Sequence, residues 1–280
     1  YMVAQLENYR GRIMTLHVLI PCSKTKELPP PKELIWTPQK RLNKWNKAWN
    51  GSSLKKPASE MYTGRTIQQQ IRLCFEHKNV KLYIISAGGG LIFPLSKEIP
   101  SYEATFLQSA GPSKKEWHLL PEGGLSNIHL NKDDKIVSFA PPAYHRVLLH
   151  DPLFPELAPN FVVGSNSPLA KVAGSICKVH ERTKEVLKTS SRDINSELLK
   201  IYLAKGENGL KQLYSSCLVL PAKKNRRRVG DEELYEVVMA APKEIRTSIT
   251  AMVKYIRHEC NISSIDTRIR AALLKVRESE

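Results

Sequence analysis

This 280-residue sequence contains few cysteines, and its first residues do not show the pattern of a secretory leader. The five cysteines are odd in number and far apart, so they indicate neither a disulfide framework nor a C-x-x-C pair. Residues 1–13 lack the apolar core of a secretory signal, and a strand-like run follows Met14 directly. We therefore expect a reducing, cytoplasmic environment, with Met14 as the natural start and residues 1–13 as an extension.

Acidic residues and long hydrophobic runs are also scarce. Lys and Arg number 43 against 27 Asp and Glu, which gives a net charge of +16. Such a surplus favours a polyanionic partner, because basic side chains that neutralise phosphates release counterions from nucleic acid. No apolar run approaches the ~20 residues of a membrane-spanning helix, and no basic amphipathic helix with aromatic anchors stands out. Nucleic acid is the predicted partner, and no membrane is expected.

The common metal and nucleotide motifs are missing as well. The histidines do not fall at zinc-ligand spacings with cysteine, and there is no H-E-x-x-H. Neither the G-x-G-x-x-G fingerprint nor the G-x-x-x-x-G-K-[ST] loop is present. We therefore predict neither a metal nor a cofactor.

Short apolar runs that alternate with helical patterns predict an α/β protein. The runs expected to form buried strands are residues 16–20, 82–86, 135–140, 161–164 and 217–220. A helix over 66–77 is clear, because Ile67, Ile71 and Cys74 recur at i, i+4 and i+7. Further helices are expected over 142–150, 193–204 and 210–215. The sheet should be mostly parallel, with helices as crossovers.

The residues after 222 predict a second, helical domain. Apolar residues recur at helical spacing around Leu234, over 245–256 and over 265–276, and Pro242 is well placed as the first residue of a helix. The expected boundaries are 14–222 for an α/β domain, 223–230 for a basic linker and 231–280 for the helical domain. The linker favours a DNA-gripping appendage, although a solvated run of charge fits the same pattern.

A long polar insertion, residues 29–56, separates the first strand from the first helix. It carries Trp36, Trp45 and Trp49 among several lysines and an arginine. Aromatic rings that alternate with basic residues suit nucleic acid, since rings stack on bases while charges hold phosphates. A surface flap whose tryptophans pack on the core is the alternative.

One segment has the composition of a ligand pocket. The strand 82–86 ends in Gly88, Gly89 and Gly90, and Tyr102 and Glu103 follow. Glycines bring backbone N–H groups close to whatever lies at the carboxyl end of a strand, where ligands of α/β sheets bind. The alternative is a tight turn that needs glycine only for its backbone conformation and binds no ligand.

The candidate acids are Glu60 and Glu103. A carboxylate in such a crevice can activate water or stabilise the cationic sugar of glycosyl-bond cleavage. Lys24 and Arg65 suit a phosphate, and Tyr62 or Tyr102 can stack on a base. Glu60 also fits a helix N-terminus favoured by the macrodipole, and Glu103 also fits an ordinary surface position. Cys22, which follows the first strand, fits a buried structural cysteine better than a nucleophile.

Three motifs together resemble a family of uncharacterised bacterial domains. Residues 21–26 follow its P-C-[SG]-x-x-K pattern, 60–65 its E-L-Y-x-G-R pattern, and 86–92 with 100–103 its S-A-x-x-G-L-[IL] and P-Y-[DE] patterns. That family is similar to the peroxide-stress YaaA proteins and to the archaeosine-synthase domain that resembles uracil-DNA glycosylase. The resemblance covers about residues 14–220 and implies a uracil-DNA-glycosylase-like sheet with flanking helices.

Residues 165–169 resemble the H-P-S-P-L loop of uracil-DNA glycosylases, whose leucine wedges into DNA as a base flips. Here Asn166 stands near the histidine position, and Leu169 takes the place of the wedge. The glycosylases' first-strand aspartate is absent from residues 21–26, so Glu60 or Glu103 would replace it. This resemblance covers only five residues, and a chance match is the alternative.

These observations predict a DNA glycosylase that flips a modified base and cleaves its N-glycosidic bond; a role against phages with hypermodified DNA is implied by the resemblance alone. The predicted catalytic residues are Glu60, Glu103 and Asn166. The predicted substrate-binding residues are Cys22, Ser23, Lys24, Tyr62, Arg65, Ser86, Gly88, Gly89, Gly90, Tyr102, Ser167 and Leu169. The predicted DNA-binding residues are Lys223, Lys224, Arg226, Arg227 and Arg228. A non-enzymatic YaaA-like DNA-binding protein and an enzyme that exchanges bases in tRNA or nucleotides are the alternatives, and the sequence predicts no oligomeric state.

Overall fold

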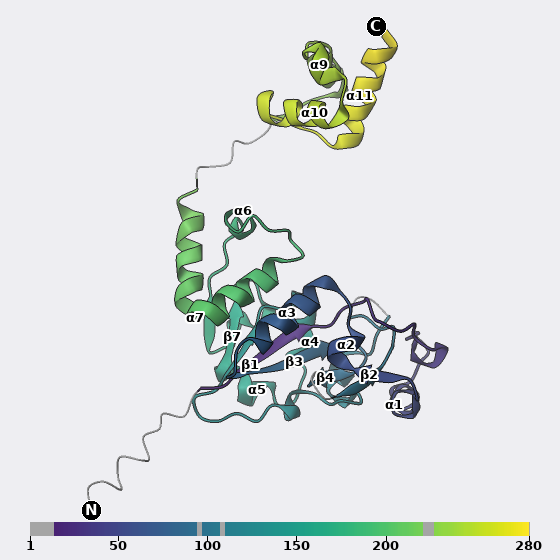
Figure 1. Ribbon diagram of the computed structural model, residues 1–280, viewed down its shortest axis with the longest axis vertical. Helices are drawn as coiled ribbons and strands as arrows, with labels where there is room; N and C mark the ends of the chain where they lie inside the picture. The colour runs from purple at the N-terminus through teal and green to yellow at the C-terminus, as the bar shows by residue number, and fades with distance from the viewer. Residues whose placement is uncertain (1–13, 94–96, 107–109, 221–226, 280) are drawn as a thin grey trace, which may run out of the picture. The chain divides into compact units, whose positions relative to one another are not determined.

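The computed structural model describes residues 14–93, 97–106, 110–220 and 227–279. The chain divides between Val219 and Leu220 into two compact units. Each has a hydrophobic core of its own, an α/β core in the first and a smaller helical core in the second. Figure 1 shows the elements of both units.

A six-stranded sheet in the order β4-β3-β1-β6-β7-β8 forms the centre of the first unit, which confirms the α/β prediction. All neighbours pair in parallel except the edge strand β4, which is antiparallel to β3. The strands are β1 (Leu16–Pro21), β3 (Val80–Ser86), β4 (Gly90–Ile92), β6 (Lys135–Ser138), β7 (Phe161–Gly164) and β8 (Ser175–Cys177). Strands β1 and β7 are buried almost throughout, as strands covered on both faces must be.

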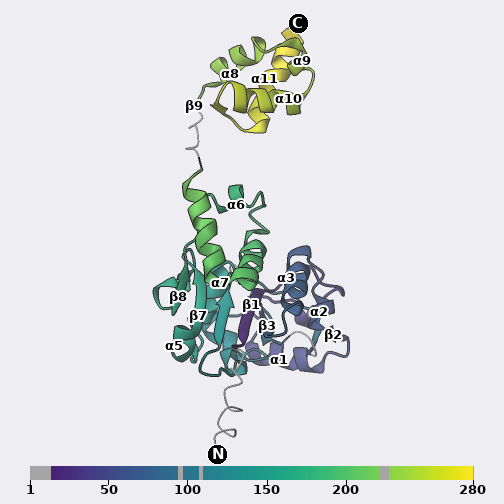
Figure 2. The same ribbon diagram turned by 60° about the vertical axis from the view of Figure 1, so that its left-hand side comes forward.

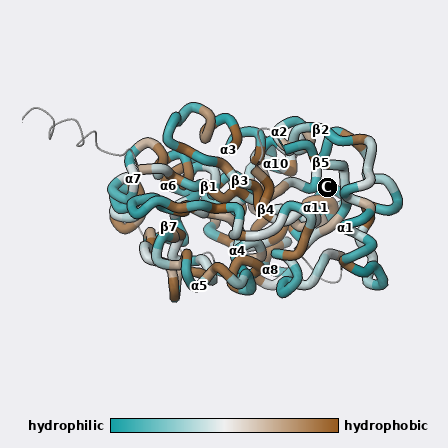
Figure 3. Tube along the Cα trace, turned by 90° about the horizontal axis from the view of Figure 1, so that it is seen from below, coloured by the Kyte–Doolittle hydropathy of each residue, from teal (hydrophilic) through white to brown (hydrophobic). Residues whose placement is uncertain are grey.

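The strand order reverses at β1. From β1 the chain crosses to β3 on one side, and from β6 it crosses to β7 on the other. Because such crossovers are right-handed, their helices cover opposite faces of the sheet. Figure 3 shows α3 on one side of the strands and α4 and α5 on the other, with hydrophobic brown around β3 and β4. Sheets of this kind bind ligands at the carboxyl ends of the strands beside such a reversal, which here are β1 and β6.

The first-unit helices follow the apolar stripes of the sequence. They are α1 (Leu42–Gly51), α2 (Ala58–Met61), α3 (Arg65–Phe75), α4 (Pro142–Leu148), α5 (Phe154–Leu157), α6 (Thr183–Val186) and α7 (Ile194–Leu218). In α3 the stripe of Ile67, Ile71 and Cys74 is buried, as predicted. Two short strands, β2 (Lys55–Pro57) and β5 (Glu98–Pro100), pair antiparallel and anchor the insertion to the chain after β4.

The strand predicted over 217–220 is wrong, because Cys217 and Leu218 end α7. Leu210, Leu213 and Cys217 recur at helical spacing and are buried, whereas Leu218 is 59% exposed. The two helices predicted over 193–204 and 210–215 are halves of α7. They bend apart at Gly206, whose φ of +60° is a conformation that favours glycine. Figures 1 and 2 show the two halves running in different directions.

The second unit packs short helices around one core. Its elements are β9 (Arg227–Arg228), α8 (Asp231–Met239), α9 (Lys243–Arg246), α10 (Ile249–Lys254), the π-helical turn η7 (Tyr255–Glu259), β10 (Ile262–Ser263) and α11 (Asp266–Ser279). The stripe predicted over 245–256 is divided between α9, α10 and η7. Pro242 precedes α9 as its N-cap rather than opening it. Within the described parts of both units, no helix is long and apolar enough to span a membrane.

Candidate functional site

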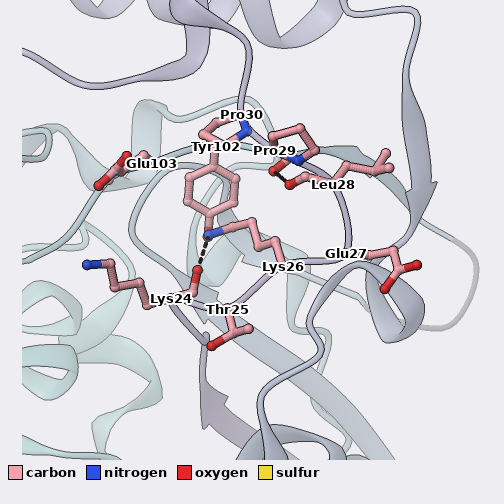
Figure 4. Close-up of a pocket in the computed structure, with 11 residues that line it drawn as sticks. Lys24, Thr25, Lys26, Glu27, Leu28, Pro29, Pro30, Tyr102 and Glu103 are labelled. Atoms are coloured by element: carbon pink, nitrogen blue, oxygen red, sulfur yellow. Dashed lines mark hydrogen bonds between the residues drawn. The ribbon is translucent and has the colours of Figure 1, made fainter.

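A cavity of about 410 Å³ lies where the chain leaves β1 and again where it leaves β5. Its lining residues are Lys24, Thr25, Lys26, Glu27, Leu28, Pro29, Pro30, Ser101, Tyr102, Glu103 and Ala104. The volume is in the range of small-ligand sites. The structure thus brings together three predicted site residues, Lys24, Tyr102 and Glu103. Figure 4 shows the Lys24 and Glu103 side chains on one side of Tyr102 and Glu27 on the other.

Backbone pairing fixes Glu103 at the rim of this cavity. Its N–H donates to the carbonyl oxygen of Leu34 at 2.7 Å, and its carbonyl oxygen accepts from the N–H of Trp36 at 2.8 Å. The side chain itself is exposed. A carboxylate on a fixed backbone, open to water and next to a cavity, can act on a water molecule or a bound cation.

Lys26, which the sequence prediction did not assign a role, is half-buried and lines the cavity. Its Nζ is 4.0 Å from the centroid of the Tyr102 ring and donates at 3.4 Å to the carbonyl oxygen of Lys24. Burial lowers the pKa of Lys26, although the nearby Cys22 and Glu103 oppose that shift. The motif P-C-[SG]-x-x-K ends on this lysine, so the signal that could have found it was present.

A buried chain of hydroxyl groups holds Tyr102 in place. The Tyr102 hydroxyl is 2.8 Å from that of Tyr62 and 2.7 Å from Ser86 Oγ, which also accepts from the N–H of Gly89 at 2.8 Å. Burial raises the pKa of both tyrosines, so both stay protonated. With Tyr62 at 0% and Tyr102 at 1% exposure, the prediction that either stacks on a base is wrong. Their rings are already enclosed by protein.

The three glycines of residues 88–90 make room for protein, not for a ligand. A Cβ on Gly88 would lie 2.5 Å from the Tyr102 ring, and one on Gly89 would lie 2.7 Å from Trp49. Gly90 has a φ of +95° and abuts the carbonyl oxygen of Gly123. The expected approach of a ligand to this backbone is therefore corrected, because aromatic side chains occupy the space.

Two of the three tryptophans of the insertion belong to the core, and the half-buried Trp36 packs against it. Trp45 is 0% and Trp49 1% exposed, and both lie on the inner face of α1. Trp45 Nε1 donates to the carbonyl oxygen of Gly88 at 2.7 Å, and Trp49 Nε1 donates to Glu122 Oε1 at 3.0 Å. Stacking of these two rings on nucleic acid is excluded by their burial, so the flap interpretation is the right one for them.

Cys22 and Ser23 follow β1 beside the cavity without lining it. The half-buried Cys22 has its Sγ 3.7 Å from the hydroxyl of Tyr144, which donates to the Cys22 carbonyl oxygen at 3.1 Å. Ser23 Oγ accepts from the N–H of Thr25 at 3.1 Å. It also occupies the space that a Cβ on Gly64 would need. These contacts shape the loop that carries Lys24 and Lys26.

Glu60 and Arg65 are not part of the cavity. Glu60 is exposed on α2, in the first turn of that short helix. Arg65 forms an ion pair with Asp193, with 2.6 Å between its Nη2 and Oδ2, while its side chain is 79% exposed. A phosphate would have to compete with Asp193 for this guanidinium.

The loop at 165–169 does not present a wedge. Leu169 is 0% exposed, and its N–H donates to Ser167 Oγ at 3.0 Å. Ser167 is itself buried and lies 2.7 Å from Nδ1 of His145. The predicted wedge is therefore corrected: Leu169 would have to leave the core to enter DNA. Asn166 is exposed at the tip of the loop.

Of the basic run, Lys223, Lys224 and Arg226 lie outside the described residues. Arg227 and Arg228 form β9, which pairs with β10 of the helical unit, and Val229 is buried in that unit's core. The guanidinium of Arg227 is paired with Glu233. The linker predicted over 223–230 therefore ends earlier than expected, because its last residues are held by the helical unit.

Neither a metal-binding cluster nor a known relative adds to the description of this site. Among the described residues, no cluster of three or more His, Cys, Asp or Glu side chains could hold a metal ion. The chain matches no protein-family model, no curated protein and no solved structure. The motif resemblances consequently stay predictions.

Proposed function

We propose that the protein is a DNA-acting enzyme that flips a base out of the stack and hydrolyses its N-glycosidic bond. The observation that supports this most is the meeting of Glu103, Lys24 and Lys26 at one 410 Å³ cavity on the carboxyl side of the sheet. The net charge of +16 supports a nucleic-acid substrate.

The chemistry assigns a role to each side of the cavity. Glu103 orients the attacking water and stabilises the oxocarbenium-like sugar as the bond to the base breaks. Lys24, exposed at the rim, holds a phosphate of the flipped nucleotide. Leu28, Pro29 and Pro30 offer apolar surface to the base, the role that the buried tyrosines cannot fill. Flipping costs a few kcal/mol of unstacking, which these contacts offset.

The finer parts of the proposal rest on the motif resemblance. They are a uracil-DNA-glycosylase-like arrangement of the sheet, a modified base as substrate and a role in defence against phages. The burial of Leu169 argues against its predicted role as a wedge and against no other part of the proposal. A cytoplasmic location fits five cysteines that are all free thiols.

Glu103→Gln tests the proposal, with Glu60→Gln as the matched control. Phage genomic DNAs are incubated with each protein, and released bases are measured by mass spectrometry together with abasic sites. We expect Glu103→Gln to lower base release roughly 100-fold or more while DNA binding is retained. Glu60→Gln should behave like the unaltered protein, because Glu60 lies away from the cavity.

Other outcomes would select another function. DNA binding without any released base would favour a non-enzymatic DNA-binding protein. A preference for folded RNA would favour a base-exchanging enzyme. Equal base release by the unaltered protein and Glu103→Gln would remove the water-activating role of Glu103.

A further inference from the structure

Lys26 lines the cavity but carries out no step of the hydrolysis described above, and it is more enclosed than Lys24, the other lysine of the lining. Lys26 is half-buried, and its Nζ lies 4.0 Å from the ring centroid of Tyr102 and 5.8 Å from that of Tyr62. Its hydrogen bonds to the carbonyl oxygens of Ser23 and Lys24 are both 3.4 Å, which is long for an N–H···O bond. Figure 4 shows this amine directly against Tyr102.

Other lysines of the same unit are held more firmly. Lys97 pairs with Glu122 at 2.8 Å. Lys40 also faces an aromatic ring, that of Trp45 at 5.7 Å, but it donates to two carbonyl oxygens at 2.8 Å outside the cavity. Lys26 forms no ion pair within 4.0 Å among the residues that the structure describes. A weakly held ammonium can give up its proton and move toward a ligand.

Burial also favours the neutral form of Lys26. Desolvation lowers its pKa more than Cys22 and Glu103 raise it. The neutral amine, which is the nucleophilic form, is therefore more populated than for an exposed lysine. The carboxylate of Glu103 lines the same cavity and can take up a proton.

We propose that Lys26 forms an imine with the C1′ aldehyde of an abasic deoxyribose and that the protein thereby cleaves the DNA strand as a lyase. The proposal rests on the proposed function, whose product is such an abasic sugar. It adds a second reaction in the same cavity.

The reaction balances without any added reagent. The neutral Nζ adds to C1′, one proton is taken up from solvent water, and loss of one water gives a protonated imine. Glu103 accepts a proton from C2′, whose electron pair forms the C2′–C3′ double bond while the C3′–O bond breaks. The downstream strand leaves with a 5′-phosphate, and water hydrolyses the protonated imine to release the unsaturated aldehyde. Glu103 and Lys26 each return one proton to solvent, which restores the carboxylate and the neutral amine.

Borohydride trapping on DNA with a preformed abasic site tests this step. The full chain is mixed with a duplex oligonucleotide that carries one abasic site, and borohydride reduces the imine to a stable amine. We expect a covalent protein–DNA adduct on a denaturing gel, with the cross-link on Lys26 by peptide mass mapping. The DNA strand should be cleaved when borohydride is left out.

Lys26→Arg keeps the positive charge but removes the nucleophilic amine. We expect at least a 10-fold loss of adduct for this variant, with DNA binding retained. Lys40→Arg is the matched control, since it alters a lysine next to an aromatic ring outside the cavity, and its adduct yield should equal that of the unaltered protein. Melting temperatures check that both variants fold. If Lys26→Arg does not fold, the position of the cross-link in the unaltered protein shows whether Lys26 forms the imine.

No adduct with the unaltered protein, or an adduct that maps to another amine, would overturn the proposal. The abasic substrate bypasses base release, so the two reactions fail separately. Base release without trapping would remove the lyase step and leave the glycosylase. Trapping without base release from any DNA would keep the lyase and remove the glycosylase.

Discussion

At the scale of single residues, His145 connects two strand ends through both ring nitrogens. Ser138 Oγ donates to the carbonyl oxygen of Leu19 at 3.0 Å, so it accepts from Nε2–H of His145 at 2.9 Å. Nδ1 therefore accepts from the Ser167 hydroxyl at 2.7 Å. The bond at Nδ1 needs a neutral ring, because a protonated Nδ1 cannot accept, and burial lowers the pKa of His145 from 6.5 to about 4.

This geometry predicts a loss of stability in mild acid. The unfolded chain takes up a proton on this histidine below pH 6.5, whereas the folded chain does so only near pH 4. Stability is thus complete above pH 6.5 and falls toward pH 4, by about 3 kcal/mol for this group. Thermal melting from pH 7.5 to 4.5 measures it. His145→Gln, which does not titrate, should melt lower at pH 7.5 but change less with pH, and an equal pH dependence in both proteins would contradict the assignment.

At the scale of elements, the loop after β3 is shaped by the aromatic side chains packed against it. Gly89→Val would place a branched side chain where Trp49 lies 2.7 Å from the Cβ position. We expect unfolding by denaturant to show a loss of about 1–3 kcal/mol, as for other overpacked cores. Gly51→Ala is the control, because nothing lies within 4 Å of its Cβ position. Unchanged stability in Gly89→Val would show that the loop can shift to admit the side chain.

The same elements show how far the sequence predicts the fold. Central parallel strands are continuous apolar runs, so residues 16–20 and 161–164 were recognisable as β1 and β7. The run 217–220 has the same composition but ends a helix, because short apolar runs do not separate the two structures. For the site, the pattern placed Lys24 and Glu103 near one strand edge. It could not show that Tyr102 is buried, since that depends on contacts with the distant Trp45 and Trp49.

At the scale of the whole molecule, the positive charge is unevenly distributed along the chain. Residues 231–280 hold eight Lys and Arg and nine Asp and Glu, so the surplus of +16 comes from the rest of the sequence. If the helical unit grips DNA, it depends on the basic run that precedes it. Within the part of that run that the structure describes, residues 227 and 228, the guanidinium of Arg227 is paired with Glu233.

This difference predicts two distinct salt dependences of DNA binding. Replacing Lys223, Lys224 and Arg226 with serine should weaken binding and flatten the plot of log affinity against log salt, by about 0.9 for each lost phosphate contact on duplex DNA. Arg227→Ser should change that slope little, since the ion pair already occupies the side chain, but should lower the melting temperature. Titrations of a labelled duplex between 50 and 200 mM salt measure both slopes. An unchanged slope in the triple variant would mean that the phosphates are held by the α/β unit, where Lys24 is the first residue to replace.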